Sequence, residues 1–329
     1  MSFVIAPTFG EGDCVVLPYA CRADAAVARR KQPRRRGPMA MTVGLLSPGD
    51  MGGAIGEVLR KNGARVLTCL RGRSERTRSL ATQAGIEDRP TLEDLVAECD
   101  VLLSVLVPAR AVEVAREVAT AVRTAETELL YVDGNAIAPR TVREIGEIVG
   151  SAGARVADVG IVGAPPRRPG TRFYASGAGA DEFARLAAYG LDVRVVGDEL
   201  GQASGLKMCY AALTKGLQAL GVELLLAARL MGLEDVLRAE QRESVPDILG
   251  WLERQVPTMP PKAYRWVGEM EEIAACFADL GLTPRMLAGA ADMYRLVART
   301  AIGRESPENR DRSRGIDGVV AALSEAMAG

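Results

Sequence analysis

The feature that most constrains this chain is a glycine-rich turn at residues 41–53, which read MTVGLLSPGDMGG. Residues 43–46 form a short apolar run typical of a strand, and after the turn Ile55, Val58 and Leu59 recur at helical spacing. The first N–H groups of such a helix have no partner within it, and they point the positive end of the helix dipole outward. The turn therefore predicts a strand–helix junction that binds a diphosphate.

Two glycines of this turn fit a dinucleotide-binding site, and two other residues depart from the pattern. Gly49 lets the backbone approach phosphates, and Gly52 lets the helix pack closely against the strand. Ser47 stands where the dinucleotide fingerprint has its first glycine, and the Asp50 carboxylate would repel a diphosphate unless it caps the helix instead. An ordinary glycine-rich turn is the alternative interpretation. The residues expected to contact a cofactor here are Ser47, Pro48, Gly49, Asp50, Met51 and Gly52.

The end of the predicted second strand, residues 64–70, distinguishes between the two nicotinamide cofactors. About 20 residues after the glycines, an NAD site carries an acidic residue that binds the ribose hydroxyls. This chain instead has Arg71, Arg73 and Ser74. Guanidinium groups and a hydroxyl suit a 2′-phosphate, which an acidic residue would repel. The pattern predicts NADP (NADPH) as the cofactor, and solvated surface arginines are the alternative.

Few residue types in this chain can carry protons near neutral pH. The 329 residues include no histidine, and only Lys31, Lys61, Lys207, Lys215 and Lys262 are lysines among 41 basic side chains. A general acid or base must therefore be Lys, Tyr, Cys or a carboxylate, and a buried lysine, unlike arginine, can give up its proton. The six cysteines show no paired spacing, which predicts reduced thiols in the cytoplasm and no metal site. The net charge of −1 indicates neither nucleic acid nor a membrane surface as a partner.

The chain divides into three parts by its pattern. Residues 1–40 contain a basic, proline-broken run, which predicts either a disordered extension or a mis-assigned start. Residues 41–199 alternate between strands and helices, which predicts an α/β fold with a doubly wound parallel sheet of Rossmann type that binds NADP. Residues 200–329 lose the strand pattern and predict an all-helical domain; its role in substrate binding and dimerisation is implied by the family resemblance given below.

The individual elements can be placed from their apolar patterns. Strands are expected at 43–46, 64–70, 100–107, 129–139, 155–166, 171–177 and 192–197. Helices of the last part are expected at 201–232, 234–253, 262–280 and 283–302. No window is expected to cross a membrane, because Lys207, Lys215 and Glu223 interrupt the most apolar stretch.

Five motifs in order make the chain resemble the β-hydroxyacid dehydrogenase and 6-phosphogluconate dehydrogenase superfamily, in its poorly characterised bacterial branch with a short helical C-terminal domain. They are VGLLSPGDMG at 43–52, GRS at 72–74, VDGNAIAP at 132–139, DVGIVGAPPRRPGT at 158–171 and GQASGLKMCYAAL at 201–213. The resemblance covers nearly everything from residue 41 onward. It implies hydride transfer between a nicotinamide and a small carbonyl or hydroxy substrate, and it adds Val107 and Asn135 to the cofactor contacts.

The resemblance places the catalytic lysine on Lys207. A dry cleft beside the positively charged oxidised nicotinamide would disfavour the ammonium form and so lower the pKa of this lysine. One turn later, the substrate-binding Asn of the family is replaced by Ala211, and the neighbouring Tyr210 is a candidate donor in its place. The carboxylate-binding Ser-Gly-Gly of the family aligns with Val162, Gly163 and Ala164, so the serine hydroxyl is lost. The substrate contacts implied by the resemblance are then Gly163, Asn135, Lys207 and Ala211.

The leading hypothesis is an NADP-dependent dehydrogenase or reductase with Lys207 as general acid/base, acting as a cytoplasmic homodimer through its helical domain. An imine reductase-like enzyme, a non-catalytic NADP-binding or redox-sensing protein, and a structural dimerisation protein are the alternatives. The predicted helix around Tyr264, Arg265, Glu269 and Glu272 is either a core or dimer-contact helix or, by resemblance, a cover for the cleft.

Overall fold

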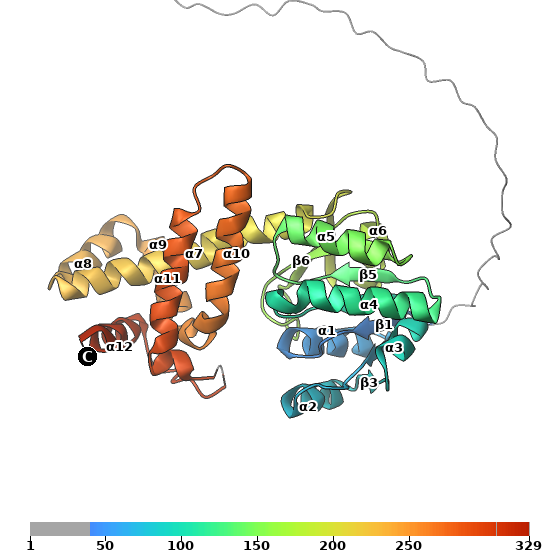
Figure 1. The fold of residues 1–329 in the computed structure, drawn as a ribbon. Helices are drawn as coiled ribbons and strands as arrows, with labels where there is room; N and C mark the ends of the chain where they lie inside the picture. The colour runs from blue at the N-terminus through green and yellow to red at the C-terminus, as the bar shows by residue number, and fades with distance from the viewer. Residues whose placement is uncertain (1–39, 307, 329) are drawn as a thin grey trace, which may run out of the picture. The chain divides into compact units, whose positions relative to one another are not determined.

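A computed structural model describes residues 40–306 and 308–328, so the predictions for residues 1–39 lie outside the described part of the chain. The first part of the described chain forms an eight-stranded sheet with the strand order β3-β2-β1-β4-β5-β6-β7-β8 (Figure 1). The strands are β1 (Thr42–Leu45), β2 (Arg65–Thr68), β3 (Glu87–Asp88), β4 (Val101–Ser104), β5 (Leu130–Asp133), β6 (Arg155–Val162), β7 (Arg172–Ser176) and β8 (Asp192–Gly197).

Neighbouring strands from β3 to β6 are parallel, whereas β7 runs antiparallel to β6 and β8 is parallel to β7. The doubly wound, mostly parallel sheet predicted from the sequence is therefore confirmed. The chain passes from β1 to β2 and β3 on one side and then returns to place β4 on the other side of β1. Open α/β sheets bind their ligands at such a reversal, outside the carboxyl ends of the strands.

Helices cover both faces of this sheet, which explains why the central strands are apolar without alternation. One face packs against α1 (Asp50–Lys61), α2 (Glu75–Ala84) and α6 (Ala180–Ala184). The other face packs against α3 (Leu92–Glu98), α4 (Ala111–Ala125) and α5 (Pro139–Gly150). All four residues of β1, β4 and β5 are buried, so the central strands have no polar face toward water.

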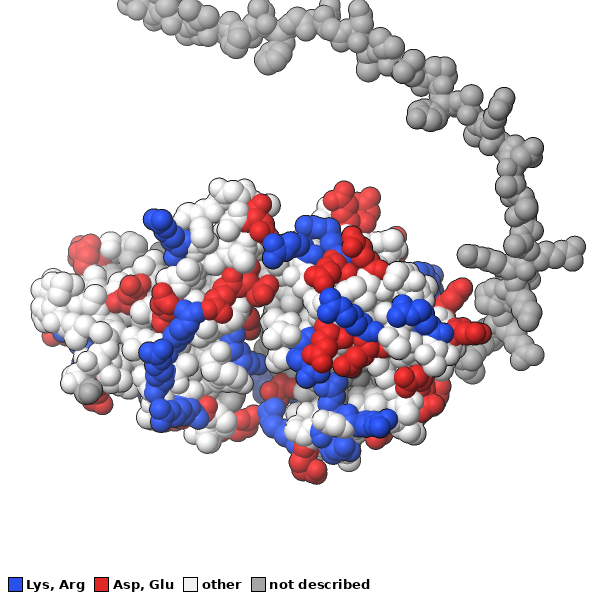
Figure 2. All heavy atoms as spheres, in the orientation of Figure 1, with Lys and Arg blue, Asp and Glu red and all other residues white. Residues whose placement is uncertain are grey.

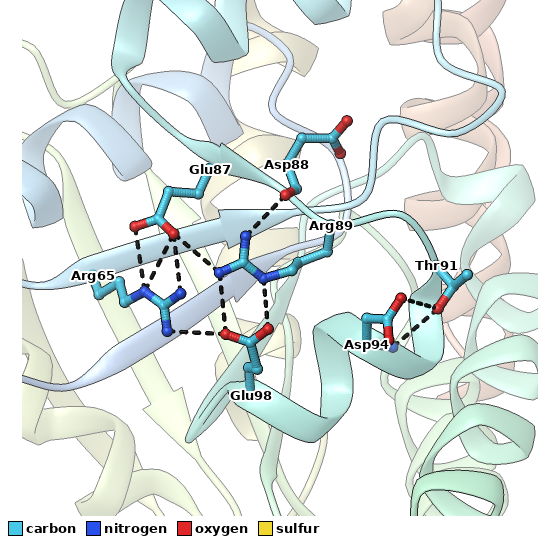
Figure 3. A network of polar contacts seen from close by, with 7 residues as sticks. All are labelled: Arg65, Glu87, Asp88, Arg89, Thr91, Asp94 and Glu98. Carbon is cyan, nitrogen blue, oxygen red and sulfur yellow. Dashed lines mark hydrogen bonds and ion pairs between the residues drawn. The ribbon is translucent and has the colours of Figure 1, made fainter.

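The two-residue strand β3 is absent from the sequence predictions, because it lacks any apolar pattern and is held by charges instead. Figure 3 shows Arg65 and Arg89 between the carboxylates of Glu87 and Glu98, with distances of 2.7–3.3 Å. The pKa values of both carboxyl groups are lowered, first by these hydrogen bonds to the guanidinium groups. The network ties β2, β3 and α3 together at this edge of the sheet.

The last part of the described chain is helical, as predicted, and its helices surround one apolar core. The long helix α7 runs from the sheet region into this part, and α10 and α11 lie across it (Figure 1). Buried side chains in this core include Met270, Tyr294 and Val320. The helices are α7 (Gln202–Leu230), α8 (Glu234–Ser244), α9 (Pro246–Gln255), α10 (Ala263–Asp279), α11 (Arg285–Arg299) and α12 (Ile316–Ala328).

Two predictions for this part are wrong. The helix expected at 234–253 is divided into α8 and α9 at Val245, whose φ of −139° and ψ of 51° are not helical. Pro246 causes the break, since proline disfavours the helical conformation of the preceding residue and donates no hydrogen bond. Helix α12 is a further helix that the sequence reading did not predict.

Helix α7 alone among the described helices meets the length and composition of a membrane-crossing helix, with 39% of its most apolar window buried. Length and composition alone are weak evidence for a span, so this finding does not overturn the prediction that α7 does not cross a membrane. The helix packs against β6, α10, α11 and α12, and these contacts account for many of its apolar residues.

Candidate active site

The glycine-rich turn has the geometry of a phosphate cradle. A Cβ atom added at Gly52 would lie 2.1 Å from the carbonyl oxygen of Ser47, so only glycine permits the close approach of α1 to β1. Gly49, the residue before α1, faces open space, and no side chain caps the helix. The N–H groups of the first turn are thus left for a ligand. The residues present therefore fit a diphosphate.

The structure also explains the acidic residue in this turn. Asp50 is the first residue of α1 and does not cap it, so the capping alternative is wrong. Its carboxylate instead accepts a hydrogen bond of 2.8 Å from the Arg76 guanidinium of α2. This ion pair reduces the repulsion that the carboxylate would exert on a nearby diphosphate. Pro48 is buried, whereas Ser47 and Met51 are half-buried beside the turn.

A cavity of about 450 Å³ lies beside the carboxyl ends of β1 and β2. Arg71 and Arg73 both line it, together with Leu46 and Cys69. Arg73 also donates a hydrogen bond of 2.7 Å to the Leu46 carbonyl, which fixes its guanidinium across the end of β1. Ser74 caps α2 by accepting from the Thr77 N–H, so its hydroxyl has a structural partner. Leu46 directly precedes the phosphate cradle, and the carboxylates of Glu93 and Glu117 line the cavity as well.

At the carboxyl ends of β4 and β5, buried polar side chains form a closed network. Asp133 accepts hydrogen bonds of 2.9 Å from both the backbone N–H and the side-chain amide of Asn135. The same amide donates to the Ser104 hydroxyl, and its oxygen accepts from the Leu106 N–H. Asn135 is 1% exposed. Its side-chain groups therefore have partners within the protein, and the role of Asn135 as a cofactor or substrate contact stays a prediction.

Asp133 lies at the centre of this network, and its role was not predicted from the sequence. It is fully buried, and burial raises the pKa of its carboxyl group from 3.8 to about 7. The hydroxyl of Tyr131, on the same face of β5, is buried and has no hydrogen-bond partner among the residues that the structure describes. By accepting from the Asn135 N–H, Asp133 closes the turn that carries residues 134 and 135.

Lys207 lies on α7 above this turn. Its half-buried ammonium donates a hydrogen bond of 3.3 Å to the Asn135 carbonyl oxygen. Burial lowers the pKa of Lys207 from 10.5 to about 8. The negative charge of Glu269 acts in the opposite direction and raises this pKa, whereas the positive charge of Lys215 lowers it further. A lysine with this pKa exchanges protons near neutral pH, as a general acid or base must.

The start of α7 is fixed on β6 by a buried carboxylate that the sequence reading did not single out. Asp158 accepts hydrogen bonds of 3.0 and 2.9 Å from the N–H groups of Gly201 and Ser204, and one of 2.6 Å from the Ser204 hydroxyl. A negative charge at a helix N-terminus is favourable because of the helix dipole. The signal available in the sequence was an isolated Asp within a buried strand.

Close packing of α7 on β6 depends on a glycine. A Cβ atom at Gly160 would lie 2.4 Å from the Ala203 carbonyl oxygen and 3.2 Å from the Cβ of Lys207. Only glycine allows the helix to approach the sheet at this distance. Asp158 and Gly160 therefore position the part of α7 that carries Lys207.

A small cavity opens beside Lys207 between α7 and α10. Apart from Lys207 and Glu269, its lining consists of apolar or backbone surface. Ala211 faces this cavity, where the resemblance expected an asparagine. Glu269 of α10 faces it too, so this carboxylate belongs to the site and α10 covers part of the cleft. The lining residues are Ala136, Ile137, Lys207, Met208, Ala211, Glu269 and Ile273.

Three further predicted residues lie outside this cavity. Tyr210 is 48% exposed and does not line it, so the geometry gives no support to its role as a replacement donor. Gly163 directly follows β6 and has a φ of +131°, a conformation that suits glycine. Val107 follows β4 and is 59% exposed at the carboxyl edge of the sheet.

The fold and the cradle define a nicotinamide-dinucleotide-binding protein, and comparison with known families agrees. The NAD binding domain of 6-phosphogluconate dehydrogenase matches residues 42–188, and a domain of unknown function, DUF1932, matches residues 228–297. An uncharacterised 28.5 kDa protein of Methanothermus fervidus is 29% identical over 197 residues, which are 60% of this chain and 74% of that protein.

Solved structures agree as well. The conserved protein MTH1747 is 32% identical to this chain, and its structure matches with a TM-score of 0.63 over 78% of this chain and 97% of that chain. MTH1747 is of unknown function and is described as structurally similar to 3-hydroxyacid dehydrogenases. A Mycobacterium tuberculosis 3-hydroxyisobutyrate dehydrogenase shares the fold at 18% identity and a TM-score of 0.65, over 87% of this chain and 99% of that one. The chain belongs to the 6-phosphogluconate dehydrogenase and 3-hydroxyacid dehydrogenase superfamily.

Proposed function

We propose that this protein is an NADP-dependent oxidoreductase that transfers hydride between the nicotinamide and a small carbonyl or hydroxy substrate, with Lys207 as general acid/base. The observation that carries the proposal is Lys207 itself: a half-buried ammonium with a pKa of about 8 beside the carboxyl end of β5. A lysine that merely kept its charge in water would not have this environment.

In this mechanism the protein residues hold the substrate and move one proton. When bound, the reduced nicotinamide supplies the hydride that forms the new C–H bond at the carbonyl carbon. Lys207 Nζ gives its proton to the carbonyl oxygen, which becomes the hydroxyl, and the neutral amine regains a proton from solvent. In the reverse direction the neutral amine accepts the hydroxyl proton. The Asn135 carbonyl, held by Asp133, directs Nζ throughout.

The preference for NADP over NAD rests on the arginines of the first cavity. Arg71 and Arg73 line it beside the end of β2, where a 2′-phosphate on the adenosine ribose would lie. Arg73 uses one N–H to bind the Leu46 carbonyl and keeps other N–H groups available. Neither arginine forms an ion pair within the described residues.

An imine substrate is a second candidate, because the small cavity offers few polar groups besides Lys207 and Glu269. A panel of carbonyl and imine compounds, assayed by NADPH oxidation, tests both candidates. Lys207→Met should abolish turnover of any active compound while NADPH binding persists. Turnover that is unchanged in this variant would contradict the proposal.

We also propose that the protein is a homodimer that associates through its helical part. Large apolar side chains are exposed along α7 and around the start of α8, and Figure 2 shows fewer charged side chains over the α8 and α9 end than over the sheet. Sedimentation velocity should give the mass of two chains. Replacement of Leu230 and Val236 by Glu should give the mass of one. These exposed residues include Leu213, Leu220, Leu230, Met231, Leu233 and Val236.

A further inference from the structure

A row of buried polar side chains crosses the sheet next to the start of α7. Its members are partners in register on β4, β5, β6 and β7, and each is 0% exposed: Ser104, Asp133, Asp158 and Ser176. Paired residues of adjacent strands point to the same face of a sheet, and such strands lie about 4.8 Å apart. The carboxyl groups of Asp133 and Asp158 are therefore neighbours away from water, where like charges repel.

The two carboxyl groups are stabilised unequally. Asp158 accepts hydrogen bonds from four groups, which belong to Ser176, Gly201 and Ser204. Three of these groups lie at the N-terminus of α7, where the helix dipole favours a negative charge. Asp133 accepts from two groups, both of Asn135. Burial raises the pKa of Asp133 to about 7, and the charge of Asp158 raises it as well.

Lys207 lies over the same two strands. A Cβ atom added at Gly160, two residues beyond Asp158 on β6, would lie 3.2 Å from the Cβ of Lys207. The Lys207 ammonium donates to the carbonyl of Asn135, two residues beyond Asp133 on β5. Alternate residues of a strand share a face, so Lys207 spans the strands on the side of the two carboxyl groups.

Four charged groups act on Lys207 from the elements around it. They are Glu269 of α10, Lys215 of α7, Asp133 of β5 and Asp158 of β6. Burial lowers the pKa of Lys207 most strongly, Glu269 opposes this effect, and Lys215 adds to it. Glu269 and Lys215 form an ion pair, so their charges largely offset each other at Lys207. Since Asp158 is occupied by the N-terminus of α7, Asp133 is the carboxylate left to balance the Lys207 ammonium.

We propose that Asp133 is a positioning residue for Lys207, and that its buried carboxylate balances the Lys207 ammonium and holds it at the end of β5. The inference rests on the proposed function, because it concerns the proton that Lys207 delivers. Without this carboxylate, Lys207 would lose its proton at a lower pH, and less of it would carry the proton that reduction needs. Between about pH 7 and 8 the Asp133 carboxylate and the Lys207 ammonium coexist, so the pair works in the neutral range.

Nuclear magnetic resonance of the lysines tests this inference without turnover. The chain has five lysines, so carbon-13 at the lysine ε-carbon gives five signals, and Lys207→Met identifies that of Lys207. In wild type this signal should titrate with a midpoint near pH 8. In Asp133→Asn the midpoint should fall by about one pH unit, because the variant removes a negative charge and nearly keeps the shape of the side chain. An unchanged midpoint in Asp133→Asn would overturn the inference.

Ser104→Ala is the matched control. It removes a buried hydroxyl of the same row, which is also a partner of the Asn135 amide, but it removes no charge. The Lys207 midpoint of this variant should equal that of wild type. A fall as large as that in Asp133→Asn would show that packing sets the titration, and it would refute the role of the charge. Circular dichroism establishes that each variant is folded.

The wild-type titration decides the question if Asp133→Asn does not fold. The chain has no histidine, so few of its groups titrate between about pH 6 and 8. As Asp133 gains its proton with falling pH, the Lys207 signal should show a second, smaller step near pH 7. A single step between about pH 6 and 10 would contradict the inference.

Turnover separates this inference from the proposed function. If both hold, the pH at which kcat/KM for carbonyl reduction falls should shift in Asp133→Asn by the same amount as the Lys207 midpoint. A shifted midpoint together with full turnover in Lys207→Met contradicts the proposed function alone. Loss of turnover in Lys207→Met, together with a Lys207 midpoint that is the same in wild type and Asp133→Asn, contradicts this inference alone.

Discussion

Replacement of Lys207 by methionine should stabilise the protein at neutral pH while it removes activity. The pKa of Lys207 is lowered from 10.5 to about 8 because burial disfavours its ammonium. Each pKa unit corresponds to about 1.4 kcal/mol, so the buried charge costs folding at most roughly 3.5 kcal/mol. Methionine has a similar length and no charge. We expect the free energy of unfolding to rise by about 1–3 kcal/mol near pH 7, since part of the side chain reaches solvent.

The gain should depend on pH in a defined direction. Below a pH of about 8 the folded and unfolded chains both carry the ammonium, and the folded state bears the whole cost. Between about 8 and 10.5 the unfolded chain binds more protons, so wild-type stability rises with pH through this group and the advantage of the variant shrinks.

Urea unfolding of wild type and Lys207→Met at several pH values measures this difference. Lys61→Met is the control, because Lys61 is exposed on α1 and should give no stabilisation that fades with pH. A Lys207→Met variant that is less stable than wild type near neutral pH would refute the reasoning. A gain that stays constant with pH would show that packing, and not the buried charge, is its source.

Three other substitutions test how the site is built. Gly160→Ala brings a Cβ within 2.4 Å of the Ala203 carbonyl oxygen, so it should shift the start of α7. We expect the variant to lose about 1–3 kcal/mol of stability in thermal unfolding and about 100-fold in turnover. A Tm and a turnover like those of wild type would contradict this. Asp158→Asn removes the charge that binds the α7 N-terminus and should cost about 1–3 kcal/mol in urea unfolding, whereas no loss would mean that this carboxylate is dispensable. Fluorescence titration of the double variant Arg71→Ala/Arg73→Ala should show a loss of about tenfold or more in NADPH affinity and little loss in NADH affinity. Equal losses for the two cofactors would argue against a 2′-phosphate site.

Much of the fold could be predicted because its signals are local. Apolar runs bounded by glycine or proline identified most of the strands, and the strand at 192–197 was predicted with the observed bounds. The strand β3 has no apolar pattern, because it consists of the two exposed acidic residues Glu87 and Asp88, which pair with β2 through the backbone. Pro246 causes the break at Val245. The break was not predicted, because apolar residues continue at helical spacing on both sides of this proline.

The site was predictable only where backbone geometry dictates residue type. Gly52 is required by a carbonyl oxygen 2.1 Å from its missing Cβ, and this kind of constraint leaves a motif in the sequence. The hydrogen-bond partners of a side chain leave no such motif in the sequence. The pairing of the Asn135 side chain with Asp133 and Ser104, for example, has no signal in the sequence. Contacts between α7 and α10, such as that of Glu269, join residues far apart in the chain and have no local pattern.

The pH dependence of turnover tests the central claim most directly. In the proposed mechanism reduction needs the Lys207 ammonium, so kcat/KM for carbonyl reduction should fall as pH rises through about 8, and oxidation of the alcohol should rise through the same pH. Lys207→Met should lose about 10²–10⁴-fold in rate and should lose this titration, with NADPH affinity retained. The same pH profile in the variant, at an undiminished rate, would contradict the assignment of Lys207 as the general acid/base.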